Sequence, residues 1–190
     1  MTLTAHGQKA KDALIAAISG VSDILEAIRT RVKEQVVGTL RDAGSVTTTT
    51  LDLVTEVTTG AIEAVQQVGG SLITGAKGIV RGSIKGVMEV GGDAGEGLER
   101  TVKGLIMGTA NVGGDVGNVA VSAVEEAISV AGEIGLSAEM AATKAVVGAI
   151  RGARQVGEEV GSTVREALLS AASLPREVIQ AAIDGEEKGK

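Results

Sequence analysis

Apolar residues recur every 11 positions along almost the whole chain. Stepping by 11 from Ala10 meets an apolar residue each time as far as Val164, with Thr109 as the single polar exception. Eleven residues in three turns give about 3.67 residues per turn, close to the α-helix and far from the period of two that a strand requires. The pattern therefore predicts an all-α protein, made of one long amphipathic helix or of several helices in a common phase.

The repeat is sharper at twice this period. Glycine begins successive blocks of 22 residues, and isoleucine recurs at another position of the same blocks. The glycines are Gly69, Gly91, Gly113, Gly135 and Gly157, and the isoleucines are Ile62, Ile84, Ile106, Ile128 and Ile150. Self-similarity at such a period is typical of repeat proteins. The Gly-Gly pairs at 69, 91 and 113 are compatible with turns between helices of roughly 18 residues, about 27 Å long. The unbroken phase favours a continuous helix instead, because a loop need not preserve it.

On a helical wheel of this period the apolar positions cover an arc of roughly 160°. Charged residues between Lys77 and Lys103 lie mostly on the opposite side. An arc so wide fits either a helix that contacts two neighbours or a helix that lies on an apolar surface. The residues expected on this face, against lipid or a partner helix, are Val54, Val57, Ile62, Val65, Val68, Leu72, Val80, Ile84, Val87, Val90, Leu98, Val102, Ile106, Val112, Val116, Val124, Ile128, Ile134, Val146, Ile150, Val156, Val160 and Val164.

Glycine is unusually frequent within this helical pattern. The chain has 28 glycines, and each one inside a helix costs about 1 kcal/mol relative to alanine. An isolated helix of this sequence should therefore be weak in water. Several glycines fall four residues apart, which leaves a smooth groove where a second helix can approach, although chance spacing explains such pairs equally well. The candidate close-packing glycines are Gly78, Gly82, Gly86, Gly104, Gly108, Gly113, Gly117, Gly148 and Gly152.

Four segments are predicted along the chain. They are an N-terminal amphipathic helix (1–43, helical over 8–42), a Gly/Thr-rich interruption (44–50), a Gly-rich repeat region (51–174), and a short terminal helix with a polar tail (175–190, helical over 175–183). Threonine is a poor helix former, so GSVTTTT is the clearest interruption. Pro175, the only proline, should end the preceding helix at Leu174.

Charge offers a weak indication of how the repeat region folds back. A reversal near residue 122 would place Lys77–Lys85 beside Glu158–Glu166, and Glu89–Glu99 beside Lys144–Arg154. Surface ion pairs contribute little to stability, so this arrangement is a minor hypothesis.

Composition excludes several classes of protein. The chain has no Phe, Tyr, Trp or Cys, which indicates a thin core or closely approaching backbones and rules out disulfides and thiolate metal sites. Its net charge of −6 disfavours nucleic-acid binding. His6 is the only histidine, whereas a metal site needs several convergent ligands. No catalytic dyad, triad or phosphate-binding motif is complete. We therefore expect no enzyme activity and no cofactor.

Membrane spans and secretion are also disfavoured. The charge-free runs are well short of the roughly 20 residues that cross a bilayer. Lys9 and Lys11 precede an apolar stretch as in a signal peptide, but Asp12 intrudes and the stretch is short. We expect a cytoplasmic protein that lies at most on the surface of a lipid body or granule.

The run TGAKGIVRGSIKGVMEVGG, followed by GLERTVKGLIMGTANVGG, resembles the 11-residue repeat region of perilipins and is similar in style to the repeats of synucleins. The resemblance covers about residues 50–172 as a pattern rather than as a signature motif. It implies a helix that is loose in water and folds on a lipid-droplet or membrane surface. Phasins, which coat polyester storage granules, are an analogue in function only. The acidic net charge departs from these families and disfavours an anionic membrane.

Two functions follow from this pattern. The first is a non-enzymatic structural protein that coats or organises an apolar surface, such as a lipid droplet, a storage granule or a membrane surface. The second is a self-assembling helical bundle or filament, packed through glycine and alanine, with a scaffolding role and copies of itself as partners in a homo-oligomer. A stress-protective disordered protein is disfavoured by the mean hydropathy of +0.26.

Overall fold

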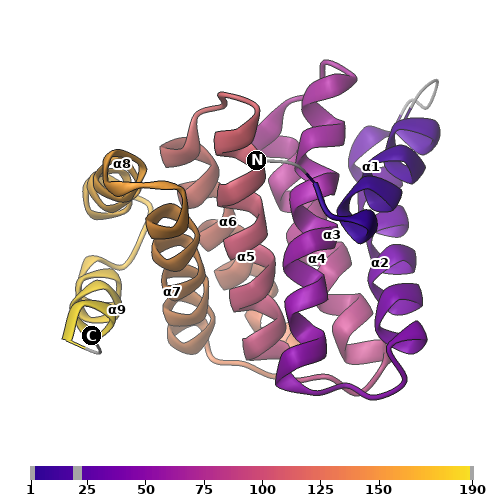
Figure 1. Ribbon diagram of the computed structural model, residues 1–190. Coiled ribbons are helices and arrows are strands. Elements are labelled where there is room, and N and C mark those ends of the chain that lie inside the picture. Colours follow the sequence, from indigo (N-terminus) through magenta and orange to yellow (C-terminus); the bar gives the residue numbers. More distant parts are fainter. Residues whose placement is uncertain (1–2, 19–22, 189–190) are drawn as a thin grey trace.

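The computed structural model describes residues 3–18 and 23–188 of the chain, and within them every element is helical (Figure 1). The elements are α1 (Ala5–Ile18), α2 (Ile24–Asp42), α3 (Thr48–Gln67), α4 (Leu72–Glu89), α5 (Ala94–Asn111), α6 (Val116–Val130), the short 3₁₀ helix η1 (Ala131–Ile134), α7 (Ala138–Val156), α8 (Glu158–Ser170) and α9 (Arg176–Lys188). The all-α fold class predicted from the 11-residue period is confirmed.

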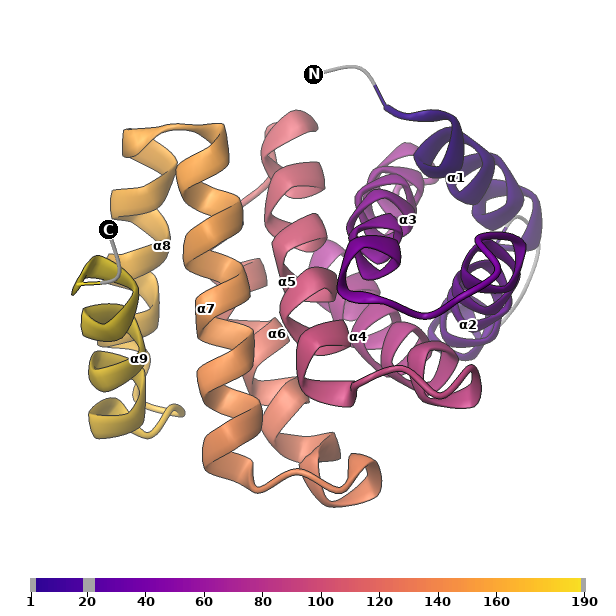
Figure 2. The same ribbon diagram turned by 60° about the horizontal axis from the view of Figure 1, so that its bottom comes forward.

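The helices form two layers that follow the order of the chain. Helices α1, α3, α5, α7 and α9 make up the odd layer, and α2, α4, α6 and α8 make up the even layer. The most extensive contacts join helices two positions apart, such as α3 with α5, α5 with α7 and α2 with α4. Figures 1 and 2 show α3, α5 and α7 side by side, with α4 and α6 behind them in Figure 1. The chain is thus a compact helical repeat rather than one extended helix.

Each 22-residue block is one helix and one turn. Helices α4, α5, α6 and α7 begin at residues 72, 94, 116 and 138, which are 22 residues apart. The glycines that precede them, Gly69, Gly91, Gly113 and Gly135, have φ angles of 73°, 79°, 68° and 72°. This left-handed conformation is costly for any residue with a Cβ. The Gly-Gly pairs are therefore turns, and the continuous helix that the phase favoured is wrong.

The phase survives these turns because the first three have the same hydrogen bonds. The N–H of Gly70 donates to the carbonyl of Val65 at 2.8 Å, that of Gly92 to Val87 at 2.9 Å and that of Gly114 to Thr109 at 2.9 Å. Such a bond, from the second residue beyond a helix back into its last turn, defines the Schellman motif. Turns of one length and one conformation return the chain to the same helical register.

The start of each repeat helix is fixed by a polar cap. Ser71, Asp93, Asp115 and Ser137 are also 22 residues apart, and each accepts a hydrogen bond from the backbone N–H three residues later. Such caps satisfy N–H groups that have no partner within the helix. Asp93, one of the charged residues between Lys77 and Lys103 that the helical wheel predicts on the polar face, is instead the N-cap of α5.

The segment boundaries differ from the prediction at three places. The single helix expected over 8–42 is two helices, α1 and α2, and residues 19–22 between them lie outside the described part. The chain does leave the helical state near the predicted interruption, over residues 43–47, but Thr48–Thr50 already belong to α3. Thr47 caps this helix by accepting a hydrogen bond from the N–H of Thr50. Helix α8 ends at Ser170 rather than at Leu174, and α9 runs beyond the predicted end to Lys188.

The predicted apolar face lies between helices of the same chain. Ile62, Ile84, Ile106 and Ile150 are each at most 1% exposed and belong to one continuous core. Of the other residues predicted on this face, Val68, Leu72, Val90, Val112, Ile128 and Val160 are half-buried, Val156 is exposed, and the rest are buried. In this structure the wide apolar arc contacts helices on both sides rather than an external surface.

Several of the predicted glycines lie where two helices of one layer touch. A Cβ on Gly82 would overlap the carbonyl oxygen of Arg29 in α2, and one on Gly148 would overlap that of Glu99 in α5. A Cβ on Gly104 would overlap the Thr58 hydroxyl and lie 2.5 Å from the Thr55 carbonyl oxygen. A Cβ would also lie unusually close to neighbouring atoms at five other glycines. The neighbours include backbone carbonyl groups at Gly108 and Gly152, and the other three are Gly78, Gly86 and Gly117. Gly113 is the exception, because it is a turn residue with open space around it.

Candidate interaction face

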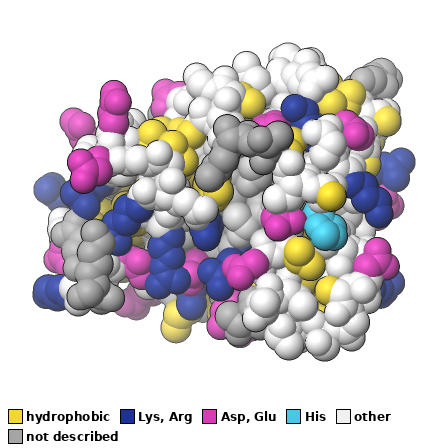
Figure 3. Space-filling model, in the orientation of Figure 1, with side chains coloured by type: hydrophobic (Ala, Val, Ile, Leu, Met, Phe, Trp, Pro, Cys, Tyr) yellow, Lys and Arg dark blue, Asp and Glu magenta, His cyan; other side chains and the backbone are white. Residues whose placement is uncertain are grey.

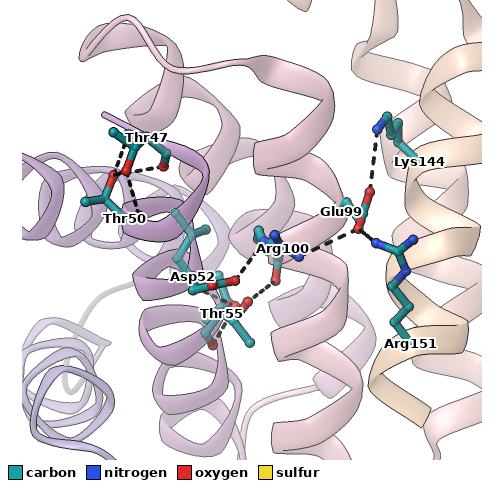
Figure 4. Close-up of polar contacts among 10 residues, drawn as sticks. Thr47, Thr50, Asp52, Thr55, Glu99, Arg100, Lys144 and Arg151 are labelled. Atoms are coloured by element: carbon teal, nitrogen blue, oxygen red, sulfur yellow. Dashed lines mark hydrogen bonds and ion pairs between the residues drawn. The ribbon is translucent and has the colours of Figure 1, made fainter. Parts of the chain in front are cut away.

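A chain of ion pairs crosses the outer face of the odd layer from α3 to α9. Arg100 Nε lies 2.9 Å from Asp52 Oδ1 across α5 and α3, and Lys144 Nζ on α7 lies 3.5 Å from Glu99 Oε2. Arg151 on α7 contacts Glu99 on one side and Glu186 of α9 on the other, the latter at 2.7 Å. Figure 4 shows Asp52, Arg100, Glu99, Lys144 and Arg151 in this arrangement, and Figure 3 shows basic and acidic side chains alternating in a row across the face.

The even layer carries a second set of ion pairs between its helices. Lys33 of α2 lies 2.6 Å from Glu89 of α4. Arg81 of α4 contacts Glu126 of α6 and lies 3.1 Å from Glu133 of η1. Because each pair joins helices two positions apart, these contacts fix the register of the repeat.

This arrangement corrects most of the predicted charge pairing. The basic residues between Lys77 and Lys85 face Glu125–Glu133 instead of Glu158–Glu166. Glu99 does lie beside Lys144 and Arg151, whereas Glu89 faces Lys33 of α2. The fold reverses at every block rather than once near residue 122, which is why only part of the predicted pairing occurs.

The even-layer pairs make the stability of the protein sensitive to acid. The hydrogen bond and charge of Arg81, together with Lys85, lower the pKa of Glu133 from its usual 4.5, and Lys33 does the same to the pKa of Glu89. A carboxylate whose folded pKa is lowered stabilises the fold above its unfolded pKa and loses that contribution as the pH falls through the folded pKa. We expect the melting temperature to drop as the pH falls from 7 to below the usual glutamate pKa of 4.5.

Circular dichroism melts of the wild type and of a Glu89→Gln/Glu133→Gln variant would measure this effect. The variant should melt lower than the wild type at neutral pH and change less over this pH range. Glu166→Gln, at an exposed position of α8, serves as the control and should keep the full pH dependence. An equal pH dependence in the double variant and the wild type would contradict the assignment.

A cavity of about 360 Å³ opens on the odd-layer face over α3 and α5. Helices α3, α5 and α7 and the residues before α1 supply its lining, which consists of Leu3, Thr4, Asp52, Thr55, Glu56, Thr59, Lys103, Met107, Asn111 and Gln155. Its volume is within the usual range for small-ligand sites. The 11-residue pattern predicts Lys103 on the polar face but does not indicate the cavity, because nothing in the spacing shows that α3, α5, α7 and the residues before α1 meet here.

Two threonine hydroxyl groups of α3, both lining this cavity, hydrogen-bond to backbone carbonyls of α5. Thr55 Oγ1 donates to the carbonyl of Arg100 at 3.1 Å, and Thr59 Oγ1 donates to that of Gly104 at 3.2 Å. Both bonds require the close approach of α3 and α5 that the absence of a side chain at Gly104 permits. These side chain-to-backbone bonds hold α3 and α5 together beside the cavity.

Neither a metal site nor a membrane span is found in the described part of the chain. No group of three or more His, Cys, Asp or Glu side chains there is placed to hold a metal ion. His6, the only histidine, lies with its Nδ1 3.2 Å from Glu56 Oε2. Among the described residues, no helix is both long enough and apolar enough to cross a bilayer.

Comparison with known proteins identifies the architecture alone. The chain is similar in structure to a de novo designed helical repeat protein, DHR7, with a TM-score of 0.54 over 97% of this chain and 96% of that one. The two sequences are 15% identical, so the likeness concerns the fold. No family model and no curated protein sequence matches the chain. The protein is thus a helical repeat, and its resemblance to perilipins and synucleins stays a prediction.

Proposed function

We propose that the protein is a non-enzymatic scaffold, a preformed helical repeat that organises other molecules on its polar outer faces. The observation that carries this proposal is the burial of the apolar face against the protein's own helices. Val80, Val102, Val124 and Val146 occupy one position of the 22-residue block, and each is 0% exposed. A chain whose apolar residues are already covered has little left with which to coat a lipid surface.

The surface supports the same proposal. On the face shown in Figure 3 hydrophobic side chains form small separate groups among charged and uncharged polar ones. The exposed residues of α8 are all polar, from Glu158 and Glu159 to Ser170. The polar outer face of α8 closes one end of the even layer, as polar capping repeats do in other repeat proteins.

The surface coat is the competing function, and it requires the two layers to separate. Separating the layers would expose the core residues between them, such as Val80 and Val102, to water before any lipid is bound. Hydrophobic burial contributes about 25 cal/mol per Å², so a lipid surface would need to replace almost the whole core. This cost favours the scaffold.

Far-UV circular dichroism distinguishes the two functions directly. The protein should be fully helical in buffer, melt cooperatively, and change neither its helicity nor its melting temperature when neutral vesicles or an oil emulsion are added. The absence of Trp and Tyr leaves intrinsic fluorescence uninformative, so circular dichroism is the method of choice. Low helicity in buffer that rises steeply with lipid would overturn the scaffold and support the coat.

A further inference from the structure

The cavity over α3 and α5 has opposite charges on its two walls. Glu56 of α3 and Lys103 of α5 both line it, yet they form no ion pair with each other. Among the described residues, no acidic side chain forms an ion pair with Lys103 and none accepts a hydrogen bond from it. Lys77, Arg81, Lys85, Arg100, Lys144, Arg151 and Arg154 of the repeat helices each have an acidic partner. A half-buried lysine without one is therefore an unusual feature of this cavity.

The acidic wall is only partly neutralised by the protein. Asp52 is paired with Arg100 at 2.9 Å, which leaves Glu56 as the main negative charge. One oxygen of Glu56, Oε2, accepts a hydrogen bond from Thr4 Oγ1 at 2.9 Å and lies near His6. Both contacts use Oε2, and Glu56 itself lines the cavity, so its Oε1 is left for a ligand.

The space between the charged walls is partly apolar. Met107 of α5 and Leu3 line it, and Asn111 and Gln155 add amide groups that can donate and accept hydrogen bonds. A cavity with one free positive charge, one free negative charge and an apolar surface between them is complementary to a ligand with the same three features. A purely anionic ligand would meet Glu56, and a purely cationic one would meet Lys103.

We propose that this cavity binds a zwitterionic peptide of about dipeptide size, with its ammonium group at Glu56, its carboxylate at Lys103 and an apolar side chain against Met107 and Leu3. The site does not depend on the scaffold function, since it needs only the folded repeat. Charge-assisted hydrogen bonds at both ends supply orientation, and the apolar contact adds affinity.

Methyl NMR of the protein labelled at the methionine methyl groups would test this proposal. Only four methionines are present, and Met107 lies in the cavity, whereas Met88 and Met140 are exposed outside it and act as internal references. Titration with alanyl-leucine should shift the Met107 signal alone, in a saturable manner, with a Kd of about 1 mM or below. Blocking either end, in N-acetyl-alanyl-leucine or alanyl-leucine amide, should weaken binding about fivefold or more.

Two variants assign each charge to its partner. Lys103→Met should bind the free dipeptide and its amide equally, because the carboxylate has lost its partner, and should still discriminate against the acetylated form. Glu56→Gln should show the reverse preference. Lys9→Met, at an exposed lysine of α1 away from the cavity, is the matched control and should behave as wild type. Unchanged circular dichroism would show that each variant is folded.

Several results would overturn the proposal. One is that the Met107 signal does not shift at millimolar dipeptide. Another is that the Met88 and Met140 signals shift together with that of Met107. The last is that the wild type binds free and blocked dipeptides equally well. The last result would indicate an apolar site without charge recognition. Loss of helicity in the wild type would instead contradict the folded scaffold, so the two proposals fail in different measurements.

Discussion

Replacing Gly82 with alanine should lower the free energy of unfolding by about 2–3 kcal/mol, although alanine is the better helix former. The added methyl group would overlap the carbonyl oxygen of Arg29, which belongs to the backbone of α2 and cannot turn aside. Helices α4 and α2 would have to move apart, and the ion pair of Lys33 with Glu89 lies in the same interface. Chemical denaturation followed by circular dichroism would measure the loss.

The chain contains its own control for this substitution. Gly38 lies 44 residues before Gly82, at the equivalent position of α2, and no atom lies within 4 Å of a Cβ built there. Gly38→Ala should therefore stabilise the protein by about 1 kcal/mol through helix propensity alone. If both variants were stabilised alike, the close packing of α4 on α2 would be wrong.

Ile106→Ala should cost about 3–4 kcal/mol, because the fully buried side chain leaves a cavity in the core when it is truncated. Ile106 is 0% exposed and belongs to the continuous core of both layers. On a lipid-coating helix the same residue would face solvent in the absence of lipid, and its truncation would hardly affect stability in buffer. A denaturation experiment without lipid therefore reports on the fold and on the function together.

Ile128→Ala is the matched comparison for Ile106→Ala. Ile128 occupies the same position one block later, in α6, but is only half-buried. Its truncation should cost about 1 kcal/mol, in proportion to the smaller area that it removes from water. Equal and small losses at both positions would contradict a packed core in the free protein.

The sequence predicts most of the buried positions of the apolar face but not what covers them. The 11-residue period places Val54, Val102 and Val146 on one face of a helix, and all three are buried. A second helix and a lipid surface both satisfy such a face, since the hydrophobic effect has no direction. The choice depends on contacts between residues some 50 positions apart, such as Gly148 with Glu99, which no local pattern encodes.

The turns could have been recognised from their chemistry. A glycine with positive φ ends a helix, and a Ser or Asp two residues later caps the start of the next one. This combination recurs at Gly69–Ser71, Gly91–Asp93, Gly113–Asp115 and Gly135–Ser137. The 11-residue phase continues unchanged across the turns because they have equal length. The pattern therefore looks like that of one continuous helix. The cavity had no comparable signal, since its lining extends from Leu3 to Gln155.

The contact of each helix with the helix two positions before it also affects how the protein folds. The ion pair between Lys33 and Glu89 joins residues 56 positions apart, and the glycine contacts span similar lengths. Each helix therefore meets its principal neighbours soon after it is synthesised, and the entropy of closing each loop is small. Folding can begin at any block and spread to the adjacent ones, as in other linear repeats. A nascent chain would already hold a stable group of helices on the ribosome before its last third had been made.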